Sequence, residues 1–470
     1  MLFSSIEFLF LFLPVVLLAY YALPFRWGLK NGWLLLASLF FYAWGEPSFV
    51  VVMLASIAFN YVMALVIAGM GRTTLRKCFL AAAIVGNLSV LGTWKYLNFI
   101  TYNIRELFPS WQPLIPQTSF VLPIGISFFT FQALSYVIDV YRGVPVQRNP
   151  LKIALYISLF PQLVAGPIVR YTTVCDQIES RKTTFAMFSD GVYRFLCGFN
   201  KKMLLANLLA VVADKAFSSA ALDMPTAWLG AICYTLQIFF DFSGYSDMAI
   251  GLGLMFGFHF LENFNYPYIS KTVTEFWRRW HISLGTWFRD YLYFPLGGSR
   301  VGKGRLVLNL SVVWLATGVW HGANWTFIAW GGLYGLLIMF EKMLDLPRHV
   351  DESPALRMIY QPFTLLAVVL GWVLFRASDM SCGWRYICTM FGNGVGGACP
   401  VSAAFEFRNI AVPILAAIAF SVPWVPWLRA KLNHHAVFDY VVCAVQFALF
   451  AFGVSYLVMN AHNPFIYFNF

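Results

Sequence analysis

Charged residues are scarce in this chain. Only 11% of its 470 residues are Asp, Glu, Lys or Arg, whereas 60% are hydrophobic. A soluble domain typically has about 25% charged residues, so the composition excludes a chain that is soluble throughout. The apolar runs are continuous and do not alternate in short segments as the strands of a membrane β-barrel do. The sequence therefore predicts an all-α, polytopic membrane protein with about ten to twelve helical spans, since each crossing takes about 20 residues.

Motifs of the common hydrolases and metalloenzymes are missing as well. There is no GxSxG, no HExxH and no zinc-type Cys/His spacing, so the signals of a serine hydrolase or a zinc enzyme are absent. The eight cysteines include no CxxC pair and are expected to be small buried residues. Gly297–Lys303 resembles a phosphate-binding loop, but Gly304 stands where that loop needs Ser or Thr. We expect no metal site and no bound cofactor.

The net charge of +11 is best explained by cytoplasmic loops and lipid headgroups, because no soluble basic domain offers a nucleic-acid surface. The first apolar run contains Glu7 and is followed by Arg26 and Lys30. The positive-inside rule then places the first loop in the cytoplasm and Met1 outside. A basic loop at 428–435 precedes one more apolar run, so both termini are predicted to be periplasmic. Without linkers or repeats, residues 1–470 are expected to form a single membrane domain.

His321 lies in an apolar run that carries no formal charge between Arg305 and Glu341. An ionisable residue at such a depth is a functional hypothesis by default. As one helix, residues 306–340 would be about 50 Å long, which overshoots a hydrocarbon core of about 30 Å. Two full spans and a turn are not expected to fit, so the run is predicted to bend, with His321 at the kink and facing protein or water.

Two acids, Asp241 and Asp247, lie in another apolar run, LQIFFDFSGYSDMAIG. Gln237 and Asp241 are four apart and would share a helical face, whereas Asp247 would point elsewhere. Buried acids must be protonated, paired or solvated. They either tie broken helices together by hydrogen bonds, or orient a histidine or line a polar tunnel.

The segment 271–298 is too charged to span the membrane and too aromatic to be a free loop. It reads as an interfacial or re-entrant helix on the cytoplasmic side. In it, His281 is expected to share a helical face with Trp277 and Arg278; as a lone histidine it could equally be structural. Arg278 and Arg279 could contact headgroups or clamp the phosphates of an anionic donor.

Six segments together resemble the membrane-bound O-acyltransferase family, closest to the branch with the alginate O-acetylation membrane subunit and its peptidoglycan-acetylating relatives. The resemblance covers most of the chain, and its specificity lies in the set and order of the segments. They are MLFSSIEFLFLFLP at the start, FPQLVAGPIVRY at 160–171, DFSGYSDMAIG at 241–251, FWRRWHISLGTWFRDYLYFPLGG at 276–298, VWHGANWTFIAWGGLYG at 319–335 and the terminal PFIYFNF.

The resemblance implies re-entrant and interfacial helices around a transmembrane tunnel with a buried histidine near its middle. By this likeness His321 is the catalytic histidine and His281 holds the second motif position. Trp277, Trp280, Arg278, Arg279, Asp241, Asp247 and Asn324 are then candidates for the donor site or tunnel wall. Burial would keep His321 neutral, the form that can take a proton from a hydroxyl.

The terminal aromatic motif places Tyr467 where relatives have a tyrosine proposed to accept and pass on the acyl group. A phenol needs a base within about 3 Å to act as a nucleophile, so Tyr467 would depend on His321 or another base. The other reading is an aromatic anchor at the membrane interface.

The resemblance therefore implies transfer of an acetyl group from a cytoplasmic thioester, with acetyl-CoA as donor, across a bacterial inner membrane for O-acetylation of an exopolysaccharide such as alginate. Because the chain has no esterase-like domain of its own, a periplasmic transferase of the SGNH esterase-like type is the expected partner, alongside the polysaccharide and the lipid bilayer; nucleic acid is not expected. Alternatives are peptidoglycan O-acetylation, D-alanyl transfer to teichoic acid, and a transporter or export subunit without chemistry.

Overall fold

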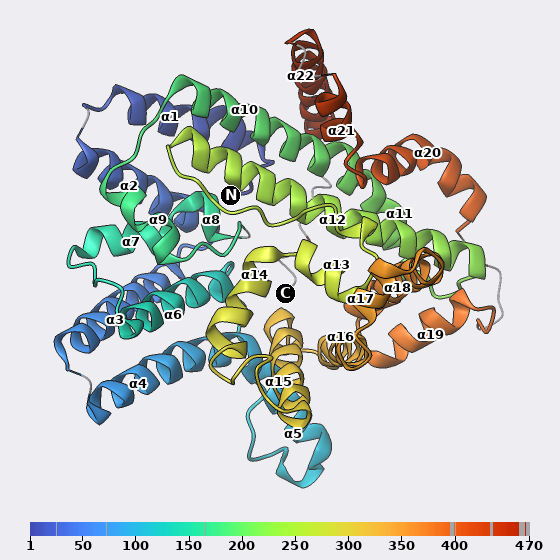
Figure 1. The fold of residues 1–470 in the computed structure, drawn as a ribbon, viewed down its shortest axis with the longest axis horizontal. Coiled ribbons are helices and arrows are strands. Elements are labelled where there is room, and N and C mark those ends of the chain that lie inside the picture. Colours follow the sequence, from blue (N-terminus) through green and yellow to red (C-terminus); the bar gives the residue numbers. More distant parts are fainter. Residues whose placement is uncertain are drawn as a thin grey trace. The chain divides into compact units, whose positions relative to one another are not determined.

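The computed structural model describes residues 1–24, 26–71, 73–164, 166–394, 399, 401–432, 436–459 and 466. Within these ranges the chain is helical, with no strand, so the all-α prediction is confirmed (Figure 1). Six of the described helices are long and apolar enough to cross a membrane, or seven if the bent pair α16 and α17 is one span. The sequence had suggested about ten to twelve crossings.

The contacts divide the chain into two compact units. The first comprises residues 1–192 and 249–261, and the second residues 193–248 and 262–470. Two long helices, α10 (Phe185–Asn200) and α12 (Met224–Met255), contribute to both units. That residues 1–470 act as a single domain stays a prediction.

The first unit contains the N-terminal helices, and two of the motif segments pack together in it. Phe3 and Phe8 from the start of the chain contact the ring of Phe160, with centroids 6.5 and 6.2 Å apart. Arg181 is buried and donates to the side chains of Asn31 and Tyr20. The elements of this unit are η1 (Phe8–Phe12), α1 (Leu13–Ala22), α2 (Trp27–Gly45), α3 (Val50–Gly69), α4 (Thr74–Leu91), η2 (Gly92–Tyr96), α5 (Leu97–Leu107), η3 (Pro109–Trp111), α6 (Ile126–Arg142), α7 (Pro150–Ser158), α8 (Phe160–Leu163) and α9 (Tyr171–Glu179).

The second unit contains the candidate site. Its large apolar core is rich in tryptophan and draws on α11, α12, α13, α15, α16, α18 and α20. The elements are η4 (Lys201–Ala206), α11 (Asn207–Ser218), η5 (Pro267–Ile269), α13 (Val273–Arg279), α14 (Ile282–Phe288), η6 (Arg289–Tyr293), α15 (Lys303–His321), α16 (Trp325–Met343), α17 (Leu346–Glu352), α18 (Pro354–Arg376), α19 (Met380–Met390), α20 (Ala403–Phe420), α21 (Trp424–Lys431) and α22 (Ala436–Met459).

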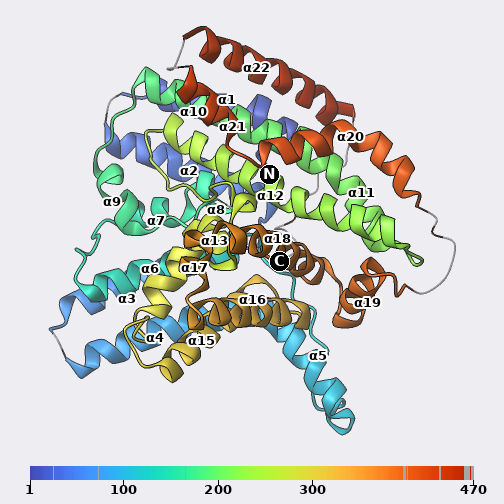
Figure 2. The same ribbon diagram turned by 45° about the vertical axis from the view of Figure 1, so that its right-hand side comes forward.

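The apolar run around His321 is a helical hairpin, so the prediction of one bent path was wrong. The helices α15 and α16 have 19 residues each and lie side by side (Figure 2). The sequence estimate rejected two spans because it underestimated how tightly a chain can turn. Residues 322–324 suffice, because the backbones approach closely: a Cβ on Gly331 would lie 2.6 Å from the carbonyl oxygen of Trp314.

Candidate active site

His321 is the last residue of α15 and is buried, with 3% of its surface exposed. Its ring is enclosed by aromatic side chains, with centroid distances of 4.8 Å to Trp330, 5.0 Å to Trp320 and 5.4 Å to Phe375. These neighbours come from α15, α16 and α18. The imidazole therefore lies inside the unit, as the sequence predicted, at the end of a helix rather than at a kink.

The hydrogen bond of His321 determines its tautomer. Nδ1 lies 2.7 Å from the carbonyl oxygen of Thr317, and a carbonyl can only accept. Nδ1 must therefore carry the proton and donate it. In the neutral ring this leaves the lone pair on Nε2, the nitrogen that can take a proton from a hydroxyl.

His281 lies between two short helices, not on one. Helix α13 ends at Arg279, and His281 adopts φ 44° and ψ 54° before α14 begins. The expectation that His281 shares a helical face with Trp277 and Arg278 was therefore wrong. A left-handed backbone is costly for a residue with a Cβ, so the fold holds this histidine against a local preference.

Asn263 holds the His281 ring in place. Its Oδ1 accepts from the backbone N–H of Ser283 at 3.2 Å, which identifies this atom as the oxygen of the amide. The same oxygen lies 3.1 Å from Nδ1 of His281, so Nδ1 donates and the lone pair is again on Nε2. Sequence reasoning missed Asn263, because an asparagine in a loop carries no distinguishing pattern.

The two histidines lie near each other. Trp320 contacts both rings, at 6.0 Å from His281 and 5.0 Å from His321. His281 lies outside the candidate spans, and burial lowers its pKa well below the ordinary value, with a further lowering by His321. His281 is therefore neutral at pH 7, because both causes disfavour the imidazolium form.

Tryptophan side chains enclose the site on the side of α13. Trp277 packs against Trp314, Trp330 and Tyr334 at 4.9 to 5.3 Å, and Trp280 packs against Trp372 at 4.7 Å. The buried Nε1–H groups of Trp277 and Trp330 have no hydrogen-bond acceptor among the described residues. Buried donors are normally satisfied by protein, water or ligand, so this side of the site offers polar contacts to a guest molecule.

Glu341 was treated in the sequence only as the boundary of an apolar run, yet it connects three helices. It is fully buried, and its carboxylate accepts from the backbone N–H groups of Val273 and Thr274 at 2.7 Å each and from the Tyr360 hydroxyl at 3.0 Å. A carboxylate at a helix N-terminus is favourable. Glu341, on α16, thereby holds the start of α13, the helix that precedes His281.

Asp241 and Asp247 are paired with cations of α10 and η4. Asp241 lies 2.6 Å from Lys202, with both side chains 2% exposed, and Asp247 lies 2.6 Å from Lys201 and from Arg194. This is the structural reading of the two acids, in which they tie helices together. Gly198 and Gly244 permit it, because a Cβ on Gly198 would lie 2.4 Å from the Gly244 carbonyl oxygen.

Comparisons with known proteins identify the family of the chain. Residues 117–369 match the model of the membrane-bound O-acyltransferase family. The chain is 41% identical to the probable alginate O-acetylase AlgI of Azotobacter vinelandii, over the whole of both chains.

The chain belongs to the membrane-bound O-acyltransferase family.

This O-acyltransferase is also similar to two further proteins. It is 47% identical to the probable alginate O-acetylase AlgI of Pseudomonas aeruginosa, over 84% of this chain and 75% of that protein. It is 32% identical to the peptidoglycan O-acetyltransferase of Helicobacter pylori, over 100% of this chain and 98% of that protein. The chain is thus a multi-pass membrane enzyme, an O-acyltransferase of the alginate branch, rather than a transporter without chemistry.

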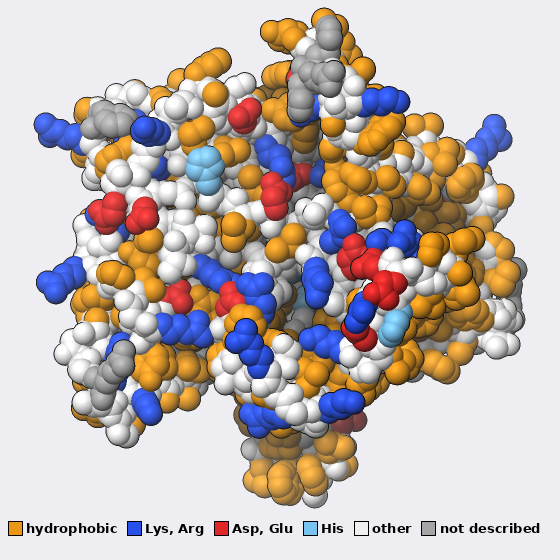
Figure 3. Space-filling model, viewed as in Figure 1, with side chains coloured by type: hydrophobic (Ala, Val, Ile, Leu, Met, Phe, Trp, Pro, Cys, Tyr) orange, Lys and Arg blue, Asp and Glu red, His pale blue; other side chains and the backbone are white. Residues whose placement is uncertain are grey.

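The arginines of the acyltransferase differ in their contacts. Arg279 pairs with Glu275 at 2.9 Å and is therefore partly neutralised. Arg278 is exposed. Figure 3 shows lysine and arginine side chains gathered over the area where Figure 1 places α13, α14, α15 and α17, with acidic side chains among them over α17. Residues 271–305 contain seven Lys or Arg and two acids, so this face of the second unit has an excess of positive charge.

Asn324 caps a helix. Its Oδ1 accepts from the backbone N–H of Thr326 at 3.1 Å, and its Nδ2 donates to the carbonyl oxygen of Ser378 at 2.7 Å. This side chain fixes the turn after His321 and ties it to the segment after α18.

Tyr467 lies outside the described residues, but its neighbour Ile466 does not. Ile466 is 5% exposed and belongs to the tryptophan-rich core. Its backbone N–H donates to Oδ2 of Asp241 at 2.9 Å. The carboxylate paired with Lys202 thus also holds the C-terminal segment one residue before Tyr467.

Proposed function

We propose that the enzyme transfers an acetyl group from a cytoplasmic thioester, acetyl-CoA, across the membrane for the O-acetylation of an exopolysaccharide such as alginate. The observation that carries the proposal is the buried His321, whose Nδ1–H is committed to a backbone carbonyl and whose Nε2 therefore holds the lone pair. Two relatives named as probable alginate O-acetylases support the acceptor. Peptidoglycan is the second candidate, because a relative that matches over 100% of this chain and 98% of its own length is named for it.

In this mechanism Nε2 of His321 takes the proton of the attacking hydroxyl as its oxygen forms a bond to the thioester carbon. The carbon–sulfur bond then breaks, and the imidazolium returns the proton to the leaving thiolate. General base catalysis of this kind contributes about 10²- to 10⁴-fold. His281 positions the thioester nearby. Its neutral ring is fixed by Asn263 and presents the lone pair of Nε2, which can accept a hydrogen bond from an amide N–H of the donor.

The donor enters from the basic face of the second unit. Arg278 and its basic neighbours bind the phosphates of the donor. The unpaired indole N–H groups of Trp277 and Trp330 then meet the amide carbonyls of the donor's arm as it reaches towards His321. By the positive-inside rule this face is cytoplasmic, and we place the enzyme in the inner membrane with both termini in the periplasm.

Tyr467 acts as a relay. Its phenol attacks the thioester with His321 as base, which gives an acetyl-tyrosine ester and a thiol. A hydroxyl of the periplasmic partner, a transferase of the SGNH type, or of the glycan then takes the acetyl group and restores the phenol. The anchored Ile466 supports this role, because Tyr467 is the next residue in the chain.

The test uses inside-out vesicles with radiolabelled acetyl-CoA. The variant His321→Ala should lose about 10²-fold or more of acetyl transfer, whereas His349→Ala, which removes an exposed histidine of α17, should not. Undiminished transfer by the first variant would overturn the assignment. Mass spectrometry of the trapped enzyme should find acetyl on Tyr467; acetyl found only at another residue would remove Tyr467 from the mechanism.

A further inference from the structure

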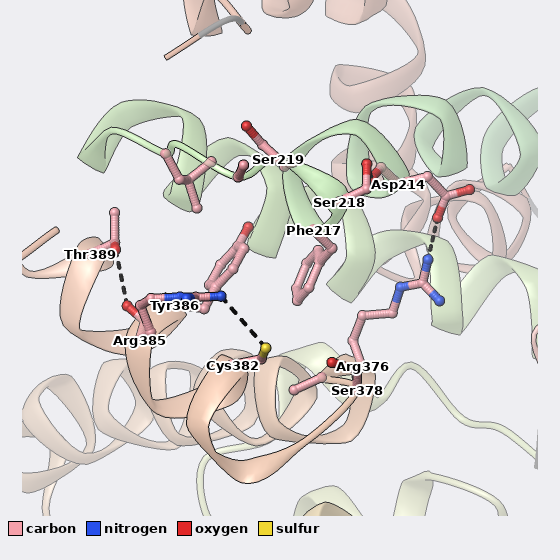
Figure 4. Close-up of a pocket in the computed structure, with 14 residues that line it drawn as sticks. Asp214, Phe217, Ser218, Ser219, Arg376, Ser378, Cys382, Arg385, Tyr386 and Thr389 are labelled. Carbon is pink, nitrogen blue, oxygen red and sulfur yellow. Dashed lines mark hydrogen bonds and ion pairs between the residues drawn. The ribbon is translucent and has the colours of Figure 1, made fainter. Parts of the chain in front are cut away.

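A pocket opens in the second unit at the far end of α18 from Pro354. It has a volume of about 330 Å³ and is lined by the ends of α11 and α18 and by one face of α19 (Figure 4). Pockets of about 300 Å³ or more hold small molecules. Phe375 contacts the His321 ring, and the next residue, Arg376, lines the pocket. The pocket is thus one residue away from the wall of the candidate active site.

The charges in the pocket leave a surplus of one positive charge. Its two arginines are Arg376 and Arg385, and its acid is Asp214, so the sum is 2 − 1 = +1. Asp214 accepts from Nη2 of Arg376 at 2.5 Å, and the Nε–H of Arg376 is buried with no acceptor among the described residues. Arg385 is exposed, and its guanidinium donates to the Cys382 thiol at 3.6 Å, a weak acceptor.

The other lining groups combine an aromatic floor with hydroxyls. The rings of Phe217 and Tyr386 are stacked, with centroids 4.2 Å apart and planes at 12°. Ser218 and Ser378 also line the pocket, and Figure 4 shows these side chains on opposite sides of the space. An apolar ring face, several hydroxyls and guanidinium groups together suit a molecule with one carboxylate, hydroxyl groups and an apolar C–H face.

We propose that this pocket binds a carboxylate-bearing sugar residue, a uronate, of the acceptor polymer. The carboxylate pairs with Arg385 and the donors of Arg376, and the ring of the sugar lies on Phe217. A single carboxylate matches the surplus charge of +1. A singly charged phosphodiester headgroup matches the charge equally, and the test below separates the two. The inference rests on the proposed function, because it makes the pocket the acceptor subsite of the same reaction. An acceptor subsite should lie away from the basic face, where the donor enters, and the pocket does lie at the opposite end of α18 from that face.

The test is a binding measurement that needs no acetyl donor. The purified full-length enzyme is incubated with trimannuronate or with neutral mannotriose, and protection of Cys382, a free thiol, from N-ethylmaleimide is followed by mass spectrometry. Trimannuronate should protect at a concentration at least tenfold lower than mannotriose. The variant Arg385→Gln should weaken the protection about tenfold or more, because a hydrogen-bonded charge pair is lost.

The matched control is Arg348→Gln, which removes an exposed arginine of α17 and should leave protection unchanged. Equal protection by both sugars, or no effect of Arg385→Gln, would overturn the inference. Protection by phosphatidylglycerol but not by trimannuronate would also overturn it, in favour of a lipid headgroup. If only the uronate pocket is wrong, the parent enzyme still transfers acetyl and His321→Ala still loses this activity. If the proposed function is wrong, the parent enzyme shows no acetyl transfer, whatever the result of the sugar-binding assay.

Discussion

The buried pair of Lys202 and Asp241 gives the most informative perturbation. Both side chains are 2% exposed, so replacing the carboxylate in Asp241→Asn leaves an ammonium group in the interior without its counter-charge. Breaking a buried pair in this way costs about 3–5 kcal/mol. Replacing both partners, as in Asp241→Asn with Lys202→Met, removes the buried charge and should restore most of the stability, since apolar replacements of such pairs are often neutral.

A second double variant separates stability from the anchoring of the C-terminal segment. The asparagine of the first double variant still offers an amide oxygen to the backbone N–H of Ile466, whereas Asp241→Leu with Lys202→Met offers none. The hydrogen bond from the Ile466 N–H is 2.9 Å long. Its loss should weaken the attachment of the C-terminal segment by about 1.5–3 kcal/mol, so the attached state should be populated roughly 10- to 100-fold less. Acetyl transfer should fall in proportion.

The assays are unfolding in detergent, followed by the fluorescence of the 17 tryptophans, and acetyl transfer in vesicles. The control is Glu352→Gln, because its pair with Arg348 is exposed and should be worth no more than about 1 kcal/mol. If Asp241→Asn is as stable as the control, the buried pair is not what holds these helices. If both double variants are stable and equally active, the bond to Ile466 has no part in the reaction.

Three further predictions concern the frame of the site. Gly331→Ala should destabilise the enzyme by about 1–3 kcal/mol, because the new Cβ would lie 2.6 Å from a carbonyl oxygen of α15, whereas Gly332→Ala, with nothing within 4 Å, should be neutral in the same unfolding assay; equal effects would contradict the close packing of the hairpin. Glu341→Ala removes the acceptor of two backbone N–H groups and a hydroxyl, so the free energy of unfolding should fall by about 3 kcal/mol or more. An unchanged midpoint of the unfolding transition would show that water replaces the carboxylate. Asn263→Ala releases the ring of His281 and should lower the turnover rate more than the affinity for acetyl-CoA, measured by initial rates in vesicles; a change confined to affinity would place this asparagine in donor binding only.

The sequence by itself was enough for the fold class and the family. It also singled out two histidines that the structure buries near each other, whereas their catalytic role stays a prediction. Hydrophobic runs determine that helices form, because a membrane leaves the backbone no other partner. His321 could be identified because an ionisable residue in a long apolar run is rare. The motif order carried the family resemblance, which the comparisons confirm.

Other features were decided only by the tertiary structure, because they depend on which residues meet across the chain. The hairpin of α15 and α16 needs two glycines to face each other's backbone, which no local pattern encodes. The left-handed backbone at His281 is disfavoured locally and persists only because Asn263 and the surrounding aromatic side chains hold the ring. The partners of Asp241, Lys202 and the N–H of Ile466, lie 39 and 225 residues away along the chain. Burial makes such long-range polar contacts strong, and the sequence leaves their choice of partner open.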